Sequence, residues 1–283
     1  WDVARALHTT LNGELRPITR EDLDAFQKNV KSLGEKLRPG ITAKQVVEMS
    51  LPVDIDRASK QIRVAIPSGG NKGAIRFITN AGPDSDRARH YVQVELAAFQ
   101  AAVASPDKPL NVARWLAKTQ PLRFDCDCGR HTFWYRYIAT IGNFNAGRDE
   151  TGYPKIRNPR LTGIACKHVL RVMSELQSSA FVHGFIAKMI EKARSGQSRQ
   201  AIRVGKGEAA KQAAKQVSKP RAIGAAVSKK LAASLKSTSP TEMGALARLP
   251  AARMSPEMAL KAFMEQTGMQ ASDIMALLKA EGK

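Results

Sequence analysis

Three cysteines and one histidine fall into two short motifs of equal length, Cys126-Asp-Cys128 and Cys166-Lys-His168. In an extended segment, residues i and i+2 point to the same side, so each motif can present two ligand atoms to one ion. Three thiolates and one imidazole form the donor set of a closed, tetrahedral zinc site. Because four protein ligands leave no position for water or substrate, the motifs predict a structural Zn²⁺ rather than a catalytic one.

Two alternatives remain open at this stage. His131 follows the first motif closely and is a rival fourth ligand. The three cysteines could instead be separate buried thiols, since free cysteine often behaves as a small core hydrophobe. An odd number of cysteines argues against a secreted disulfide framework and for folding in a reducing cytoplasm. Arg123, Arg130 and Lys167 lie beside the motifs, where positive charge would lower thiol pKa values and favour metal binding.

The surrounding residues resemble the SWIM-type zinc finger, in which C-x-C and a variable spacer precede C-x-H at the start of a helix. The resemblance covers about residues 122–176 and rests on Phe124-Asp-Cys126-Asp-Cys128-Gly and Gly163-Ile-Ala-Cys166-Lys-His168. It implies Cys126, Cys128, Cys166 and His168 as zinc ligands, in a small α+β module that binds nucleic acid or protein. The spacer of 37 residues is longer than usual for the family, and we expect it to hold an inserted hairpin and loop.

A second, weaker resemblance concerns residues 128–142 together with 154–159, which are similar to stretches in structural proteins of large tailed bacteriophages. It implies a component of a virion that is assembled in the host cytoplasm, contacts other protein subunits and is oligomeric in its assembly. A cytoplasmic or nucleoid location is the alternative.

The charge of the chain is concentrated. Lys and Arg total 45 against 25 Asp and Glu, and residues 113–172 and 188–236 carry 18 of the 20 surplus positive charges. Such stripes attract polyanions, so the alternative function is nucleic-acid binding through the zinc module and basic segments. The candidate residues for DNA or RNA contact are Arg130, Arg136, Arg157, Arg160 and Lys167. Trp134, Tyr135 and Tyr137 would stack on bases if exposed, but we expect most of them in the core.

Hydrophobic periodicity predicts an α+β fold. Apolar residues from Leu23 to Leu37 recur at helical spacing after Thr19, and Thr42-Ala-Lys-Gln45 has the pattern of a capping box. Alternation over 62–66 and 75–79 predicts a hairpin, and 91–96 reads as a strand or a helix start. Alternating aromatics predict a further strand over 133–138. Amphipathic patterns predict helices from about 164 to 176 and from 181 to 190.

These elements suggest four regions: an N-terminal α+β region (1–110), a zinc-binding module with following helices (111–190), a basic linker or arm rich in Ala and Lys (191–250), and a small C-terminal helical unit (251–283). The arm is expected to be either a flexible linker or a lone helix that is solvated all round. Ser255-Pro256-Glu257 is a helix-start pattern.

Several function classes lack their sequence signals. No apolar run approaches the roughly 20 residues of a membrane span, so no membrane partner is expected. No nucleophile elbow, H-E-x-x-H motif or phosphate loop occurs. We therefore expect a protein that is not an enzyme.

Overall fold

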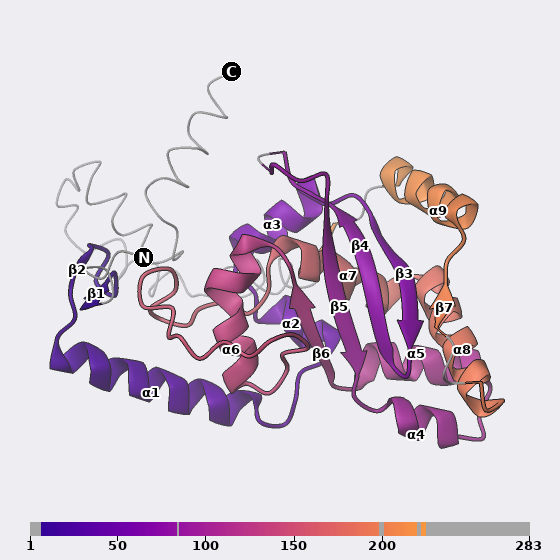
Figure 1. Cartoon of the computed structure of the whole chain (residues 1–283), viewed down its shortest axis with the longest axis horizontal. Helices are drawn as coiled ribbons and strands as arrows, with labels where there is room; N and C mark the ends of the chain where they lie inside the picture. Colours follow the sequence, from indigo (N-terminus) through magenta and orange to yellow (C-terminus); the bar gives the residue numbers. More distant parts are fainter. Residues whose placement is uncertain (1–6, 84, 198–200, 220–221, 225–283) are drawn as a thin grey trace, which may run out of the picture.

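A five-stranded antiparallel sheet forms the centre of the computed structural model, which describes residues 7–83, 85–197, 201–219 and 222–224 (Figure 1). The spatial order is β6-β5-β4-β3-β7. The strands are β3 (Ala65–Asn71), β4 (Ala74–Asn80), β5 (Arg89–Leu96), β6 (Leu122–Cys126) and β7 (Ile202–Arg203). With the helices around it, this sheet confirms the predicted α+β class.

The predicted hairpin is β3–β4, and its turn is tighter than the glycine-rich sequence suggested. Asn71 pairs with Ala74, so only Lys72 and Gly73 lie between the strands. Their φ angles of 48° and 88° are those of a two-residue type I′ turn, which matches the twist of antiparallel strands. β3 begins at Ala65 rather than Ile62, because Ile62 is the C-cap of α3 (Pro52–Gln61) and the N–H groups of Arg63 and Val64 donate to the side chain of Asn80 instead of to a strand.

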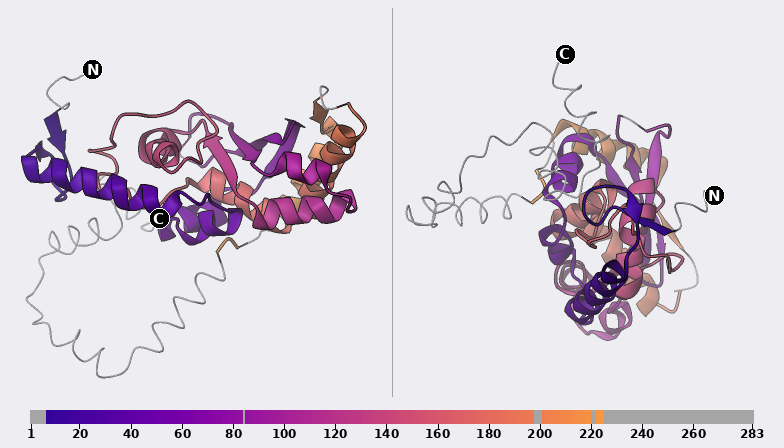
Figure 2. Two further views of the ribbon diagram at one scale, coloured as in Figure 1. Left: turned by 90° about the horizontal axis from the view of Figure 1, so that it is seen from below. Right: turned by 90° about the vertical axis from the view of Figure 1, so that its left-hand side faces the viewer.

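Helices cover one face of the sheet. α7 (Lys167–Ser178) contacts β3, β5 and β6, while α8 (Ala180–Arg194) contacts β3 and α5 (Pro109–Thr119). α2 (Ala43–Glu48) packs against α7, and α4 (Phe99–Ala104) packs against α8. Figure 2 shows this layer below the sheet in its left panel. The helices predicted near 164–176 and 181–190 are therefore α7 and α8, which pack against the sheet.

Helix boundaries follow the predicted caps. Thr42 and Gln45 form both hydrogen bonds of the capping box at the start of α2. α1 (Arg20–Leu37) begins after Thr19, as predicted, and continues through Gly34. It extends away from the sheet beside a two-stranded hairpin of β1 (His8–Thr9) and β2 (Arg16–Pro17) (Figure 1). Leu23 was predicted on the apolar side of this helix, but it is 50 % exposed.

The strand predicted over 133–138 is wrong. Residues 131–141 form a π-helical turn, η2 (His131–Tyr135), followed by α6 (Arg136–Ile141). The buried members of this segment are His131, Trp134, Tyr135, Ile138 and Ala139. Their spacing is that of one helix face. The segment therefore has both a strand-like alternation of aromatics and a helix-like spacing of apolar residues, and it folds as a helix. The inserted hairpin expected in the spacer is accordingly a helix followed by a loop.

The start of the predicted basic arm is part of the sheet layer. β7 pairs with β3 through Arg203 opposite Gly69 and Ile202 opposite Gly70. α9 (Lys206–Ser218) contacts β3, and the amide of Gln216 hydrogen-bonds both the N–H and the C=O of Ala65. Thus α9 is not solvated all round, because it satisfies the backbone of β3 beyond the short β7. The predicted C-terminal helices lie outside the described residues.

Strand pairing also crosses the boundary expected near residue 110, since β6 pairs with β5. Among the helices that the structure describes, none is long and apolar enough to cross a membrane.

Candidate metal centre

The two cysteine-containing motifs meet in the core. Cys126, Cys128, Cys166 and His168 are all buried, and their ligand atoms lie within 4.8 Å of one another. The Sγ of Cys126 is 3.9 Å from Nδ1 of His168. The three thiols form no disulfide. The alternative of three separate buried cysteines is therefore wrong, and the cluster is a potential metal site.

Each ligand is positioned by the end of a secondary-structure element. Cys126 is the last residue of β6, where it is paired with Val92 of β5. Cys128 lies in the turn that leads to η2. Cys166 is the N-cap residue of α7 with an extended backbone, and His168 lies in the first turn of that helix. The first ligand pair thus begins in the sheet, and the second pair bends from extended backbone into a helix.

Burial and mutual hydrogen bonding set the protonation of the cluster. The Cys126 and Cys166 thiols surround the sulfur of Cys128 and hold the pKa of Cys128 well below its usual range. Burial raises the pKa values of Cys126 and Cys166 and lowers the pKa of His168. The neutral imidazole and the thiolate of Cys128 match the protonation states that a metal requires of its ligands, whereas Cys126 and Cys166 would release their protons on binding.

The donor set fits Zn²⁺. Zinc binds thiolate sulfur at about 2.3 Å and imidazole nitrogen at about 2.0–2.1 Å in tetrahedral geometry, which places neighbouring ligand atoms roughly 3.6–3.8 Å apart. The separation of 3.9 Å between Cys126 and His168 is close to this. The ring nitrogen of His168 that lies near the sulfurs is thus Nδ1, and the other, Nε2, is buried without a hydrogen-bond partner.

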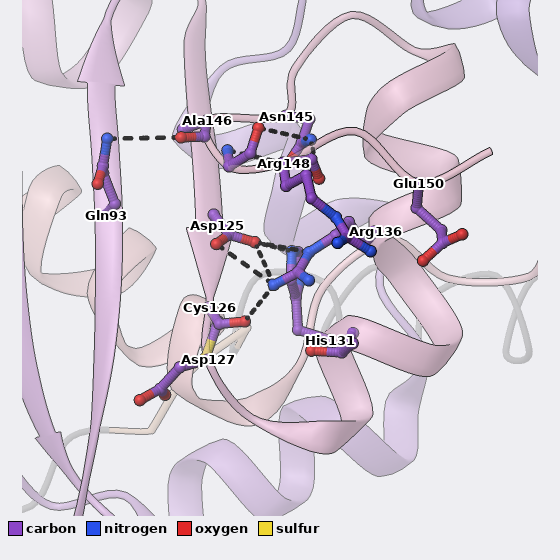
Figure 3. Close-up of polar contacts among 12 residues, drawn as sticks. Gln93, Asp125, Cys126, Asp127, His131, Arg136, Asn145, Ala146, Arg148 and Glu150 are labelled. Atoms are coloured by element: carbon purple, nitrogen blue, oxygen red, sulfur yellow. Dashed lines mark hydrogen bonds and ion pairs between the residues drawn. The ribbon is translucent and has the colours of Figure 1, made fainter. Parts of the chain in front are cut away.

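His131, the rival ligand, lies outside the cluster. Its Nε2 is 3.1 Å from Oδ1 of Asp125, and its backbone N–H donates to the sulfur of Cys128. Arg136 donates to the same carboxylate and to the backbone carbonyl of Cys126 (Figure 3). Desolvation opposes ionisation of Asp125, but these neighbours outweigh it and lower the pKa of its carboxyl. Asp125 therefore connects β6 to η2 and α6 and is not one of the cluster residues.

A second aspartate supports the histidine ligand indirectly. Asp127 Oδ1 is 2.9 Å from Nδ1 of His90 and accepts a hydrogen bond from the backbone N–H of Tyr91. The ring of His90 lies 4.4 Å from the ring of His168, centroid to centroid. The aspartates that flank Cys126 are thus hydrogen-bonded to groups outside the sulfur cluster, and both organise its surroundings.

Three of the five predicted nucleic-acid contacts are engaged by other side chains of the protein. Arg130 donates to Asp54, and its guanidinium lies 3.5 Å from the ring centroid of Trp134. Arg136 is held by Asp125, and Lys167 donates to the side-chain oxygen of Gln61.

The other two predicted contacts, Arg157 and Arg160, are exposed in the loop after α6, and Arg160 donates to the carbonyl of Leu11. Trp134 and Tyr135 are buried, which leaves Phe133 as the exposed aromatic of that segment.

One buried network was not foreseen from the sequence. Asp54 of α3 is fully buried and accepts hydrogen bonds from the hydroxyl of Tyr135 at 2.5 Å and from Arg130 at 3.0 Å. This carboxylate joins α3 to the turn that carries Cys128. No local pattern around Asp54 signals this, because its partners lie more than 70 residues away in the chain.

An open cleft of about 530 Å³ lies beside the cluster. Cys128 and His168 line it together with Arg57, Arg87 and the exposed ring of Phe133. The site is therefore buried but lies close to solvent on one side.

Comparison of the chain with protein-family models, with curated proteins and with solved structures finds no match. The likeness to a zinc finger accordingly rests on the two motifs and on the geometry of the cluster.

Proposed function

We propose that this chain is a non-enzymatic, zinc-binding structural protein that acts as a component of a larger assembly. One observation carries the zinc half of the proposal: four buried protein donors, three of sulfur and one of nitrogen, converge within 4.8 Å. When bound, Zn²⁺ would supply a cross-link between the end of β6 and the start of α7. All four donors come from the protein, so the ion has a stabilising role rather than a catalytic one.

The N-terminal unit supports the assembly half. α1 extends away from the sheet beside the β1–β2 hairpin (Figures 1 and 2). Leu7, Leu15 and Leu23 in this unit are each at least half exposed. Because exposed apolar surface is a feature of protein interaction sites, we assign this unit to contacts with other subunits. The similarity of residues 128–142 and 154–159 to phage structural proteins favours a virion as that assembly.

Metal analysis tests the first half. Purified wild-type protein should contain about one zinc per chain by mass spectrometry. The His131→Gln variant, which alters the rival ligand, should keep it, whereas Cys166→Ala should lose it. A metal-free wild-type protein that melts cooperatively and gains no stability from added zinc would contradict the proposal.

Sedimentation tests the second half. The wild-type protein should form larger species as its concentration rises, and the double variant Leu15→Ser/Leu23→Ser should remain monomeric with its zinc retained. Arg114→Ser/Lys118→Ser on α5 is a matched surface control that should associate like the wild type. A wild-type protein that stays monomeric at all concentrations would contradict self-assembly and leave the zinc site unaffected.

A further inference from the structure

The face of the sheet opposite the helix layer carries exposed polar side chains. Residues alternate along β5, where His90, Val92, Val94 and Leu96 are buried and the residues between them are exposed or half-buried. In the left panel of Figure 2 the described helices α2, α5 and α8 all lie on the far side of the sheet from this surface. Because antiparallel sheets commonly leave one face in water, this surface, which we call the open face, is available to a ligand at β3, β4 and β7. At its β6 side the segment after α6 lies against it, since Gln93 donates a hydrogen bond to the carbonyl of Ala146.

Strand register places two arginines around a glycine on the open face. Arg203 of β7 pairs with Gly69 of β3, Gly69 pairs with Arg76 of β4, and Arg76 pairs with Gln93 of β5. Gly69 has no side chain, so the sheet surface is lower at this position than at the arginines on either side of it. A groove of about 500 Å³ lies there, lined by Gly69, Arg76, Gln93 and Arg203 among others.

The charge of the open face is positive. Its exposed cations are Arg76, Arg89, Arg123 and Arg203. Of its two acids, Asp125 is already held by Arg136, and Glu95 accepts a hydrogen bond from Gln93. All four cations are arginines, whose planar forks bind phosphate oxygens in pairs and also stack on flat rings.

One of these arginines already stacks on an aromatic ring. The guanidinium carbon of Arg76 lies 4.0 Å from the ring centroid of Tyr91, which is its diagonal neighbour on β5. This pair forms a flat platform next to the groove. Bases stack on such arginine and aromatic surfaces when they are unpaired, whereas the bases of a duplex hide their faces.

From the arginine row, the glycine trough and the stacked pair, we infer that the open face binds single-stranded nucleic acid. The phosphates contact Arg76 and Arg203 on either side of Gly69, and a base stacks beside Tyr91. This surface differs from the residues predicted from the sequence, of which Arg130 and Arg136 are engaged by internal carboxylates. An acidic protein partner would use the same charges but would gain nothing from the flat platform.

Charge reversal on the open face tests the inference in the full-length, zinc-loaded protein. Binding of a fluorescent 20-nucleotide oligo-dT is followed by anisotropy at several salt concentrations. Arg76→Glu/Arg203→Glu should weaken binding at least tenfold and reduce the magnitude of the salt slope by about 1–2, because two phosphate contacts are lost. The matched control Arg114→Glu/Lys118→Glu changes the net charge equally, but on α5 of the helix layer, and should change affinity less than twofold.

Two further measurements separate stacking from charge. Tyr91→Ser should lower affinity for oligo-dT about five- to tenfold and leave the salt slope unchanged. A duplex of equal length should bind more weakly than the single strand. Zinc content and melting temperature, measured for every variant, distinguish failure of this inference from failure of the metal site.

Three results would overturn the inference. The first is equal loss of binding in the two charge-reversal variants, which would assign affinity to total charge. The second is unchanged binding in Arg76→Glu/Arg203→Glu, or in the milder Arg203→Gln if the double variant does not fold. The third is equal or tighter binding of the duplex, which would exclude the stacked base.

Discussion

Replacement of Cys166 by alanine is the most informative perturbation of the metal centre. Cys166 is fully buried at the N-cap of α7, and its sulfur is one of four donors that face each other. Its loss leaves two sulfurs and one imidazole, which cannot close a tetrahedral shell. We expect the variant to lose its zinc and a large part of its stability.

The size of the effect follows from the length of chain that the ion closes. Zinc would join Cys128 to Cys166, a loop of about 39 residues. Closing such a loop removes unfolded-state entropy worth about 4 kcal/mol in the chain-entropy treatment of cross-links. Total stabilities are about 5–15 kcal/mol, so this loss is severe. At roughly 2–4 °C per kcal/mol for a domain of this size, the melting temperature should fall by about 8–16 °C.

Differential scanning calorimetry with and without a chelator measures this loss. The chelator should lower the melting temperature of the wild type to about that of Cys166→Ala, and it should leave the variant unchanged. Val169→Ala is the matched control, because Val169 is equally buried in the same helix but offers no ligand. It should cost roughly 1–3 kcal/mol through the cavity it creates and keep its zinc.

A Cys166→Ala protein that still binds one zinc per chain would refute the assignment of this ligand. So would a wild type whose melting temperature is the same in chelator and in zinc. Either result would show that the convergence of thiols serves packing and not metal binding.

Three further predictions concern the surroundings of the site and the N-terminal unit. His131→Gln should lower zinc affinity by at most about 10–100-fold, the range of a supporting contact rather than a ligand. Metal competition with a chromophoric chelator measures this affinity. Asp54→Asn should cost about 3 kcal/mol by urea unfolding, since it leaves the largely buried charge of Arg130 unpaired, and a loss below about 1 kcal/mol would contradict that role. Arg16 hydrogen-bonds Asp22 and holds the pKa of its carboxyl well below the ordinary value of 3.8, so the ionised form stabilises the fold fully above about pH 4 and this contribution fades as pH falls further. Asp22→Asn should therefore destabilise the protein most at neutral pH and progressively less below about pH 4, as pH-dependent melting would show.

Local residue patterns were sufficient where the decisive contacts are local. Thr42 and Gln45 are three residues apart, and their reciprocal hydrogen bonds needed no distant partner. The hairpin of β3 and β4 follows from alternation and from a turn with Lys72 and Gly73 at positive φ. The two ligand pairs, Cys126 with Cys128 and Cys166 with His168, could also be predicted from the sequence. Two donors that are two residues apart cannot lie far from each other.

Tertiary contacts decided the remaining features. Residues 131–139 are helical although their aromatic residues alternate. In the helix Tyr135 is buried, and its hydroxyl donates to the buried carboxylate of Asp54. His131 is paired with Asp125, so His168 and not His131 is the fourth donor of the cluster. β7 and α9 completed the sheet edge from a segment whose composition resembles a linker, because the unpaired backbone of β3 required partners that no neighbouring residue could supply.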